Sequence, residues 1–158
     1  MDTESSAAKE SSDRELVIER VFDAPRPLVW KAWTDPEHRA QWMGPQGFTG
    51  SVLKMDFRPG GEYRFYMRSS AGTDHWQQGV FREIVEPERL VCTYLWADAA
   101  GNPTRPETQL TVTLEERGEK QTKLTLRQSI FESVTARDEH NRGWSTSLDR
   151  LAEYLAKA

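Results

Sequence analysis

The sequence offers little obvious metal chemistry, although it contains three histidines. His38, His75 and His140 stand far apart in the chain, and none belongs to an HExxH pair or another close metal-ligand spacing. His38 and His140 fall in predicted helices and His75 in a predicted turn. We therefore expect all three to be solvated surface histidines, and we predict no metal site.

Covalent chemistry has no better support from the sequence. Cys92 follows Leu90 and Val91 in a strand-like segment where nothing suggests a neighbouring base, so we expect a small buried hydrophobic residue. As the only cysteine, it also excludes an internal disulfide. Gly60 and Gly61 lack the surrounding pattern of a phosphate-binding loop, and no GxSxG elbow occurs. The motifs predict no catalytic residue and no cofactor.

Two carboxylates, Asp56 and Glu83, are the candidates for acid–base chemistry. Glu83 has the same strand parity as Phe81, so it faces inward if Phe81 does, unless a bulge intervenes. A carboxylate in an apolar cavity would have its pKa raised by desolvation, which suits an acid or base. The alternative is that Glu83 lies at the strand end, paired with an arginine or solvated. Asp56 and Glu83 are therefore possible polar cavity residues.

A long C-terminal helix is the element most able to position such groups. In the segment 133–158, the apolar residues Trp144, Leu148, Leu151 and Leu155 recur at intervals of four, three and four. This spacing places them on one helical face, and charged residues occupy the remainder. No proline follows Val134, so about 24 residues would form a helix roughly 36 Å long. Such a helix is long enough to lie across a whole sheet.

Seven strands are predicted before this helix. Two short helices follow the first strand; a proline pair opens one, and Asp35 and Pro36 open the other, which ends near Trp42. Short turns join most of the later strands, which makes neighbours antiparallel. The predicted strands are 15–23, 48–57, 62–68, 76–85, 90–96, 108–114 and 122–131. The order predicts an α+β fold in which the C-terminal helix covers one face of an antiparallel sheet.

The composition is that of an ordinary cytoplasmic domain. Of 158 residues, 37% are hydrophobic and 29% charged, with a formal net charge of −4 and no basic run that would favour nucleic-acid binding. No apolar stretch approaches the roughly 18 residues of a membrane span. Residues 1–14 contain no large apolar residue except Met1, so we expect a disordered leader before one domain at 15–158.

Five short motifs, in this order, carry a family resemblance. They are Val-Trp-Lys-Ala-Trp-Thr-Asp-Pro at 29–36, Trp-Met-Gly-Pro at 42–45, Arg-Pro-Gly-Gly at 58–61, Pro-Glu-Arg-Leu at 87–90, and Gly-Trp at 143–144 continuing to Leu148 and Leu151. With the predicted elements, they resemble the helix-grip fold of the START-like, or SRPBCC, superfamily. Within it, the chain is similar to bacterial relatives of the C-terminal domain of the heat-shock protein 90 ATPase activator.

The resemblance implies a deep cavity between a curved sheet and the long helix, often used for apolar small molecules. Side chains on the inward faces of the predicted elements would either pack as an ordinary core or, if the sheet curls around the helix, line a pocket of some hundreds of Å³. The predicted cavity residues are Trp42, Tyr63, Phe65, Met67, Phe81, Leu110, Val112, Leu126, Trp144, Leu148 and Leu151.

Three functions remain open at this point. The first is binding of a small apolar or aromatic molecule under the C-terminal helix, without a reaction. The second is an enzyme of the cyclase/aromatase sort, with Glu83, Asp56 or Tyr63 in acid–base roles. The third is a chaperone-associated protein-interaction module, although the eukaryotic activator has a separate N-terminal domain where this chain has only the predicted leader. We expect no nucleic-acid or membrane partner, and a homodimer is possible.

Overall fold

A computed structural model describes residues 13–157 and gives the element order predicted from the sequence. Seven strands, two short helices and one long helix are present among these residues. They are β1 (Leu16–Phe22), α2 (Arg26–Thr34), α3 (Pro36–Trp42), β2 (Thr49–Met55), β3 (Glu62–Arg68), β4 (Asp74–Val85), β5 (Arg89–Ala97), β6 (Thr108–Arg117), β7 (Gln121–Ser129) and α4 (Val134–Lys157). The predicted α+β helix-grip class is confirmed.

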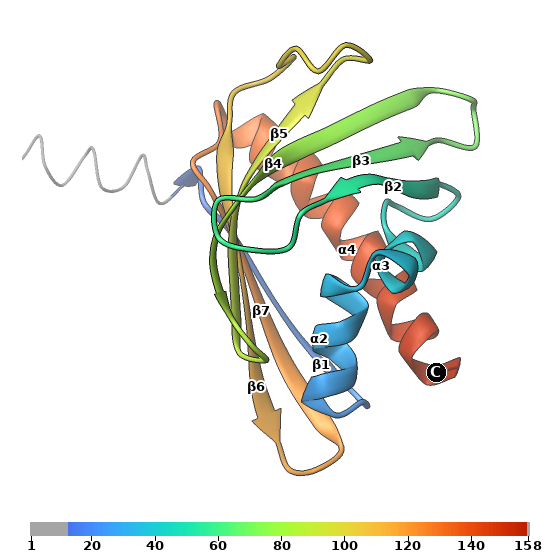
Figure 1. Cartoon of the computed structure of the whole chain (residues 1–158), viewed down its shortest axis with the longest axis vertical. Coiled ribbons are helices and arrows are strands. Elements are labelled where there is room, and N and C mark those ends of the chain that lie inside the picture. Colours follow the sequence, from blue (N-terminus) through green and yellow to red (C-terminus); the bar gives the residue numbers. More distant parts are fainter. Residues whose placement is uncertain (1–12, 158) are drawn as a thin grey trace, which may run out of the picture.

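All seven strands belong to one antiparallel sheet in the order β1-β7-β6-β5-β4-β3-β2. The strands from β2 to β7 form a meander, and β1 adds to its far edge beside β7. The sheet curves, and α2, α3 and α4 all lie on its concave side (Figure 1). The concave face is therefore where the core and any enclosed cavity must form.

Strand β3 shows how the sequence pattern selects the buried face. Tyr63, Phe65 and Met67 are 3–6% exposed, whereas the residues between them point to the other face. Successive side chains of a strand alternate between faces, so the period-two pattern fixes which three residues enter the interior. This predicted alternation is confirmed.

The short helices begin where the sequence predicts. Each has a proline in its first turn, where a missing N–H group costs no hydrogen bond. Asp35 caps α3, and its Oδ1 accepts hydrogen bonds from the backbone N–H groups of Glu37 (3.0 Å) and His38 (3.4 Å). This cap fixes the direction of α3, whose later residues reach the interior.

The long helix α4 is capped by Ser133, whose Oγ accepts a hydrogen bond from the backbone N–H of Ala136 at 3.0 Å. In its C-terminal half, Leu148, Leu151 and Leu155 are 0–5% exposed and belong to the hydrophobic core. Within the described part of the chain, no helix is both long enough and apolar enough to cross a membrane.

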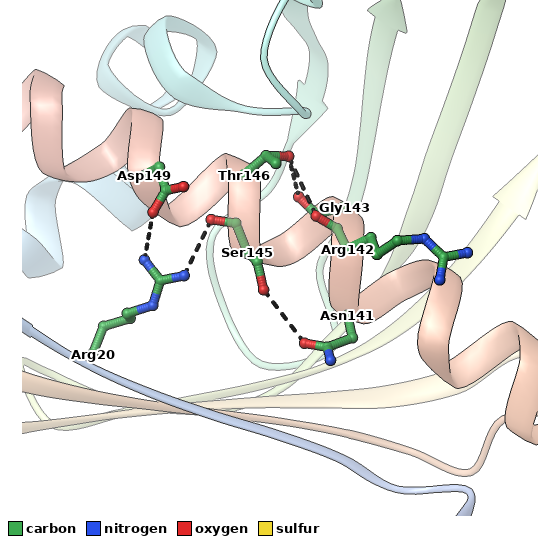
Figure 2. Close-up of polar contacts among 7 residues, drawn as sticks. All are labelled: Arg20, Asn141, Arg142, Gly143, Ser145, Thr146 and Asp149. Carbon is green, nitrogen blue, oxygen red and sulfur yellow. Dashed lines mark hydrogen bonds and ion pairs between the residues drawn. The ribbon is translucent and has the colours of Figure 1, made fainter.

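One edge of α4 is tied to β1. Arg20 of β1 pairs with Asp149 at 2.7 Å and also donates a hydrogen bond to the carbonyl of Ser145 at 3.3 Å (Figure 2). On α4 itself, the hydroxyl of Thr146 donates back to the carbonyls of Arg142 and Gly143. The Arg20 contacts join the first strand to the middle of the last helix.

Most of the predicted leader, residues 1–12, lies outside the described residues. Its last two residues are described, and both contact the region where β7 ends and α4 begins. The backbone N–H of Phe131 donates to the carbonyl of Arg14 at 3.1 Å, and Arg137 donates to the carbonyl of Asp13.

The C-terminal half of α4 should dominate stability. Because Leu148 is 0% exposed, Leu148→Ala removes buried apolar surface and leaves a cavity, so the free energy of unfolding should fall by about 2–5 kcal/mol. Leu53→Ala is the matched control at a position that is 54% exposed, and its effect should stay within about 0.5 kcal/mol. Urea denaturation of both variants tests this, and equal losses would contradict it.

Candidate functional site

A cavity of about 670 Å³ lies between the concave face of the sheet, α3 with the loop after it, and the N-terminal half of α4. The sheet contributes residues of β3, β4 and β5 to its wall, and the loop after β5 contributes to its rim. The helix α4 therefore has two roles. Its C-terminal half packs mainly in the core. The cavity is covered by Glu139, His140, Gly143 and Trp144 of the N-terminal half, together with Ser147 just past the middle of the helix.

Four of the eleven predicted cavity residues line this space: Trp42, Phe65, Met67 and Trp144. The other seven do not line it; they are at most 3% exposed and pack in the hydrophobic core: Tyr63, Phe81, Leu110, Val112, Leu126, Leu148 and Leu151. A period-two or helical pattern identifies the buried face of an element. It does not say which part of that face is packed and which part borders a void.

Neither Asp56 nor Glu83 lines the cavity. Asp56 pairs with Arg58 at 2.9 Å, and Glu83 pairs with Arg89 at 3.2 Å; all four side chains are substantially exposed. The ladder between β4 and β5 shifts register between Phe81 and Glu83. A bulge at this point breaks the shared parity of these two residues, so Phe81 faces the core and Glu83 faces solvent.

The main polar group that sequence reasoning missed is Arg39, on α3. It lines the cavity although its residue is only 7% exposed. Its guanidinium carbon lies 4.5 Å from the ring centroid of Trp33, 5.1 Å from that of Trp42 and 5.0 Å from that of Phe65. Burial lowers the pKa of Arg39 from its usual value because desolvation penalises the charged form.

A sequence signal for Arg39 does exist. Arg39 precedes Trp42 by three residues, so both side chains fall on the same face of a helix. The buried residues of α3 are these two. The orientation of α3 that buries Trp42 thus buries Arg39 as well.

Two hydroxyl groups also face the cavity. Tyr94 on β5 is 7% exposed and Ser147 on α4 is 4% exposed, and both line the space. Neither hydroxyl hydrogen-bonds to another described residue. Burial raises the pKa of Tyr94 well above its usual value, so its hydroxyl stays a neutral donor at physiological pH.

The structure differs from the expectation that the three histidines are solvated. His140 is half-buried in the cavity wall, where its Nε2 accepts a hydrogen bond from the indole N–H of Trp96 at 2.9 Å. An indole N–H can only donate, so Nε2 carries no proton, and Nδ1 donates to the carbonyl of Ala136 at 2.8 Å. Burial lowers the pKa of His140, which favours this neutral form.

The other two histidines have separate surroundings. His75 lines the cavity between the rings of Phe48 and Trp96, and His38 hydrogen-bonds the hydroxyl of Tyr154. Among residues 13–157, no group of three or more histidine, cysteine, aspartate or glutamate side chains could hold a metal ion.

Cys92 is buried on β5, as predicted. Burial raises the pKa of its thiol to about 11, so it remains protonated near neutral pH and is a poor nucleophile. Its neighbour Tyr63 donates a hydrogen bond to the carbonyl of Thr93 at 2.6 Å and accepts one from Gln77 at 2.7 Å. These groups support the sheet beside the cavity.

Arg150 fixes the rim formed by the loop after α3. Its Nη1 donates hydrogen bonds to the carbonyls of Met43 (2.8 Å), Gly44 (3.0 Å) and Pro45 (3.2 Å). Those three residues line the cavity. One guanidinium thus holds this rim to α4 and satisfies backbone acceptors that follow the end of α3.

Comparisons with known proteins agree with this architecture. A family model described as "Activator of Hsp90 ATPase homolog 1-like protein" matches residues 23–156. A protein from Chromobacterium violaceum is 30% identical, with a TM-score of 0.80 over 90% of this chain and 96% of that one. A protein from Arthrobacter aurescens is 26% identical, with a TM-score of 0.84 over 93% and 88% of the two chains. A search of curated protein sequences finds no significant match to the chain.

The His140 hydrogen bonds predict a pH dependence of stability. The folded pKa of His140 lies below the ordinary histidine value of 6.5, so the unfolded chain takes up this proton first as the pH falls. The stability that neutral His140 provides is therefore present above about pH 6.5 and declines below it. In urea denaturation, the stability difference between the wild type and His140→Gln should shrink from pH 7.5 to pH 5. A difference that stays constant would contradict this assignment.

Proposed function

The chain belongs to the family of Activator of Hsp90 ATPase homolog 1-like proteins, and from this premise we propose that it binds a small apolar or aromatic molecule in the cavity under α4. The observation that supports the proposal is the cavity itself. Its volume of about 670 Å³ falls within the range of about 300–1,000 Å³ that is common for small-molecule sites.

The wall of the cavity suits an apolar or aromatic ligand. Seven phenylalanine, tyrosine and tryptophan side chains contribute to it, from β3, β4, β5, α3, α4 and the loop before β2: Trp42, Phe48, Phe65, Trp76, Tyr94, Trp96 and Trp144. Aromatic rings offer flat apolar surfaces against which a ligand ring can stack at little entropic cost. Polar side chains lie among them, but most of the accessible surface of the wall is apolar, which is the usual composition of a pocket that orients a mostly apolar molecule.

The enzyme alternative has less support. Asp56 and Glu83, two of its proposed acid–base residues, form ion pairs outside the cavity. The third, Tyr63, is buried below it and already hydrogen-bonded to Thr93 and Gln77. Both ring nitrogens of His140 are also engaged. The cyclase-like, chaperone-associated and homodimeric possibilities remain predictions, and the proposed setting for ligand binding is the cytoplasm.

Gly143 gives a direct test, because a side chain added there enters open space. A Cβ at this position would meet only the Cγ of Pro45, at 3.9 Å, and Gly143 lines the cavity. Gly143→Phe should fill the cavity entrance and weaken binding of the neutral dye N-phenyl-1-naphthylamine at least about tenfold. Dye fluorescence titration measures this, with saturable binding expected for the wild type.

Gly143→Ala is the matched control for the dye experiment. It adds one methyl group at ordinary contact distance, so dye affinity should stay within about twofold. The same change should raise the free energy of unfolding by about 0.5–1 kcal/mol, because alanine favours the helix. The proposal fails if the wild type shows no saturable dye binding, or if Gly143→Phe binds the dye as well as Gly143→Ala does.

A further inference from the structure

A buried cation without an anionic partner lies in the cavity wall. Arg39 is 7% exposed, and no carboxylate of the described residues forms an ion pair with it. The acidic residues that line the cavity have other partners. Asp74 accepts a hydrogen bond from Tyr66 at 2.6 Å, Glu139 lies 3.9 Å from Arg105, and Asp98 accepts backbone hydrogen bonds within its own loop.

The aromatic rings around Arg39 offset only part of the free-energy cost of burying its charge. Three ring centroids lie 4.5–5.1 Å from its guanidinium carbon. The negative faces of these rings attract the positive charge. Ring faces, however, are not good acceptors for the five N–H groups of a guanidinium. Nη1 donates to the carbonyl of Trp33 at 3.2 Å, Nε is buried without a partner, and Nη2 has no acceptor among the described residues.

The remaining hydrogen-bonding groups of the cavity include further donors. The hydroxyls of Tyr94 and Ser147 line the same space as Arg39 and make no hydrogen bond with another described residue. A cation and hydroxyl donors, set in a largely aromatic wall, are complementary to an anionic group attached to an apolar body.

We infer that the ligand of this cavity carries a single carboxylate that pairs with Arg39, so that the preferred ligands are small aromatic or aliphatic carboxylic acids. This inference rests on the proposed function and specifies its ligand class. One singly charged group matches the one uncompensated cation. The other arginine of the wall, Arg105, already pairs with Glu132 at 2.9 Å and with Glu139, so the cavity has no second free cation among the described residues for a dianion.

A matched pair of ligands tests the carboxylate without altering the protein. 1-Naphthaleneacetate and 1-naphthaleneacetamide share one ring system and nearly one shape, and they differ in charge. Each is used at pH 7.5 to displace N-phenyl-1-naphthylamine from the wild-type protein. The acid should bind at least about tenfold more tightly than the amide, because only the acid can form a hydrogen-bonded ion pair with Arg39.

Substitution of Arg39 then tests whether this residue causes the preference for the acid over the amide. In Arg39→Met, the acid and the amide should bind within about twofold of each other, while the amide keeps its wild-type affinity within about threefold. Arg82→Met is the control, because Arg82 is an exposed arginine on β4 that does not line the cavity; it should keep the full preference. If Arg39→Met does not fold, Arg39→Gln carries the same expectation.

Failure of the inference and failure of the proposed function give different results. Equal binding of acid and amide by the wild type would overturn the inference and leave apolar ligand binding intact. The same conclusion follows if the preference for the acid survives in the folded Arg39 variant. Absence of dye binding to the wild type would instead remove the proposed function, and the inference with it.

Discussion

The width of the sheet compared with the thickness of a helix determines the rest of this structure. Seven strands at a spacing of about 4.8 Å make a sheet roughly 29 Å wide, whereas one helix with its side chains is only about 10–12 Å across. The helix α4 therefore cannot cover the concave face alone. The helices α2 and α3 cover a further part of it (Figure 1), and the part that remains is the cavity. The curvature of the sheet encloses this remainder.

The sequence was sufficient for the elements and for their order. Period-two alternation in β3 and the four-three-four spacing from Trp144 to Leu155 both indicate which side chains are buried. Burial of these apolar side chains drives folding. The same signals could not separate cavity wall from core. Met67 lines the void, whereas Tyr63 on the same face of the same strand packs below it. That difference depends on which element lies opposite, which is a tertiary property.

Two polar features escaped sequence analysis for different physical reasons. Glu83 was a cavity candidate because strand parity was assumed to be continuous, and the bulge after Phe81 interrupts it. Arg39 was missed because arginine in a short helix is usually solvated. The spacing to Trp42 is the one local signal of its burial. The other two rings come from α2 and β3, which no local pattern links to α3.

The division of α4 into a packing half and a covering half has an evolutionary consequence. Substitutions at Leu148 or Leu151 act on the core that maintains the fold, whereas Ser147 and Gly143 border a void and can vary in size at a smaller cost in stability. Under the proposed function, ligand specificity and folding are encoded at separate positions of one helix. Natural selection can change the lining of the cavity without first having to rebuild the protein, which is a property expected of a scaffold that diverges widely in sequence while its architecture persists.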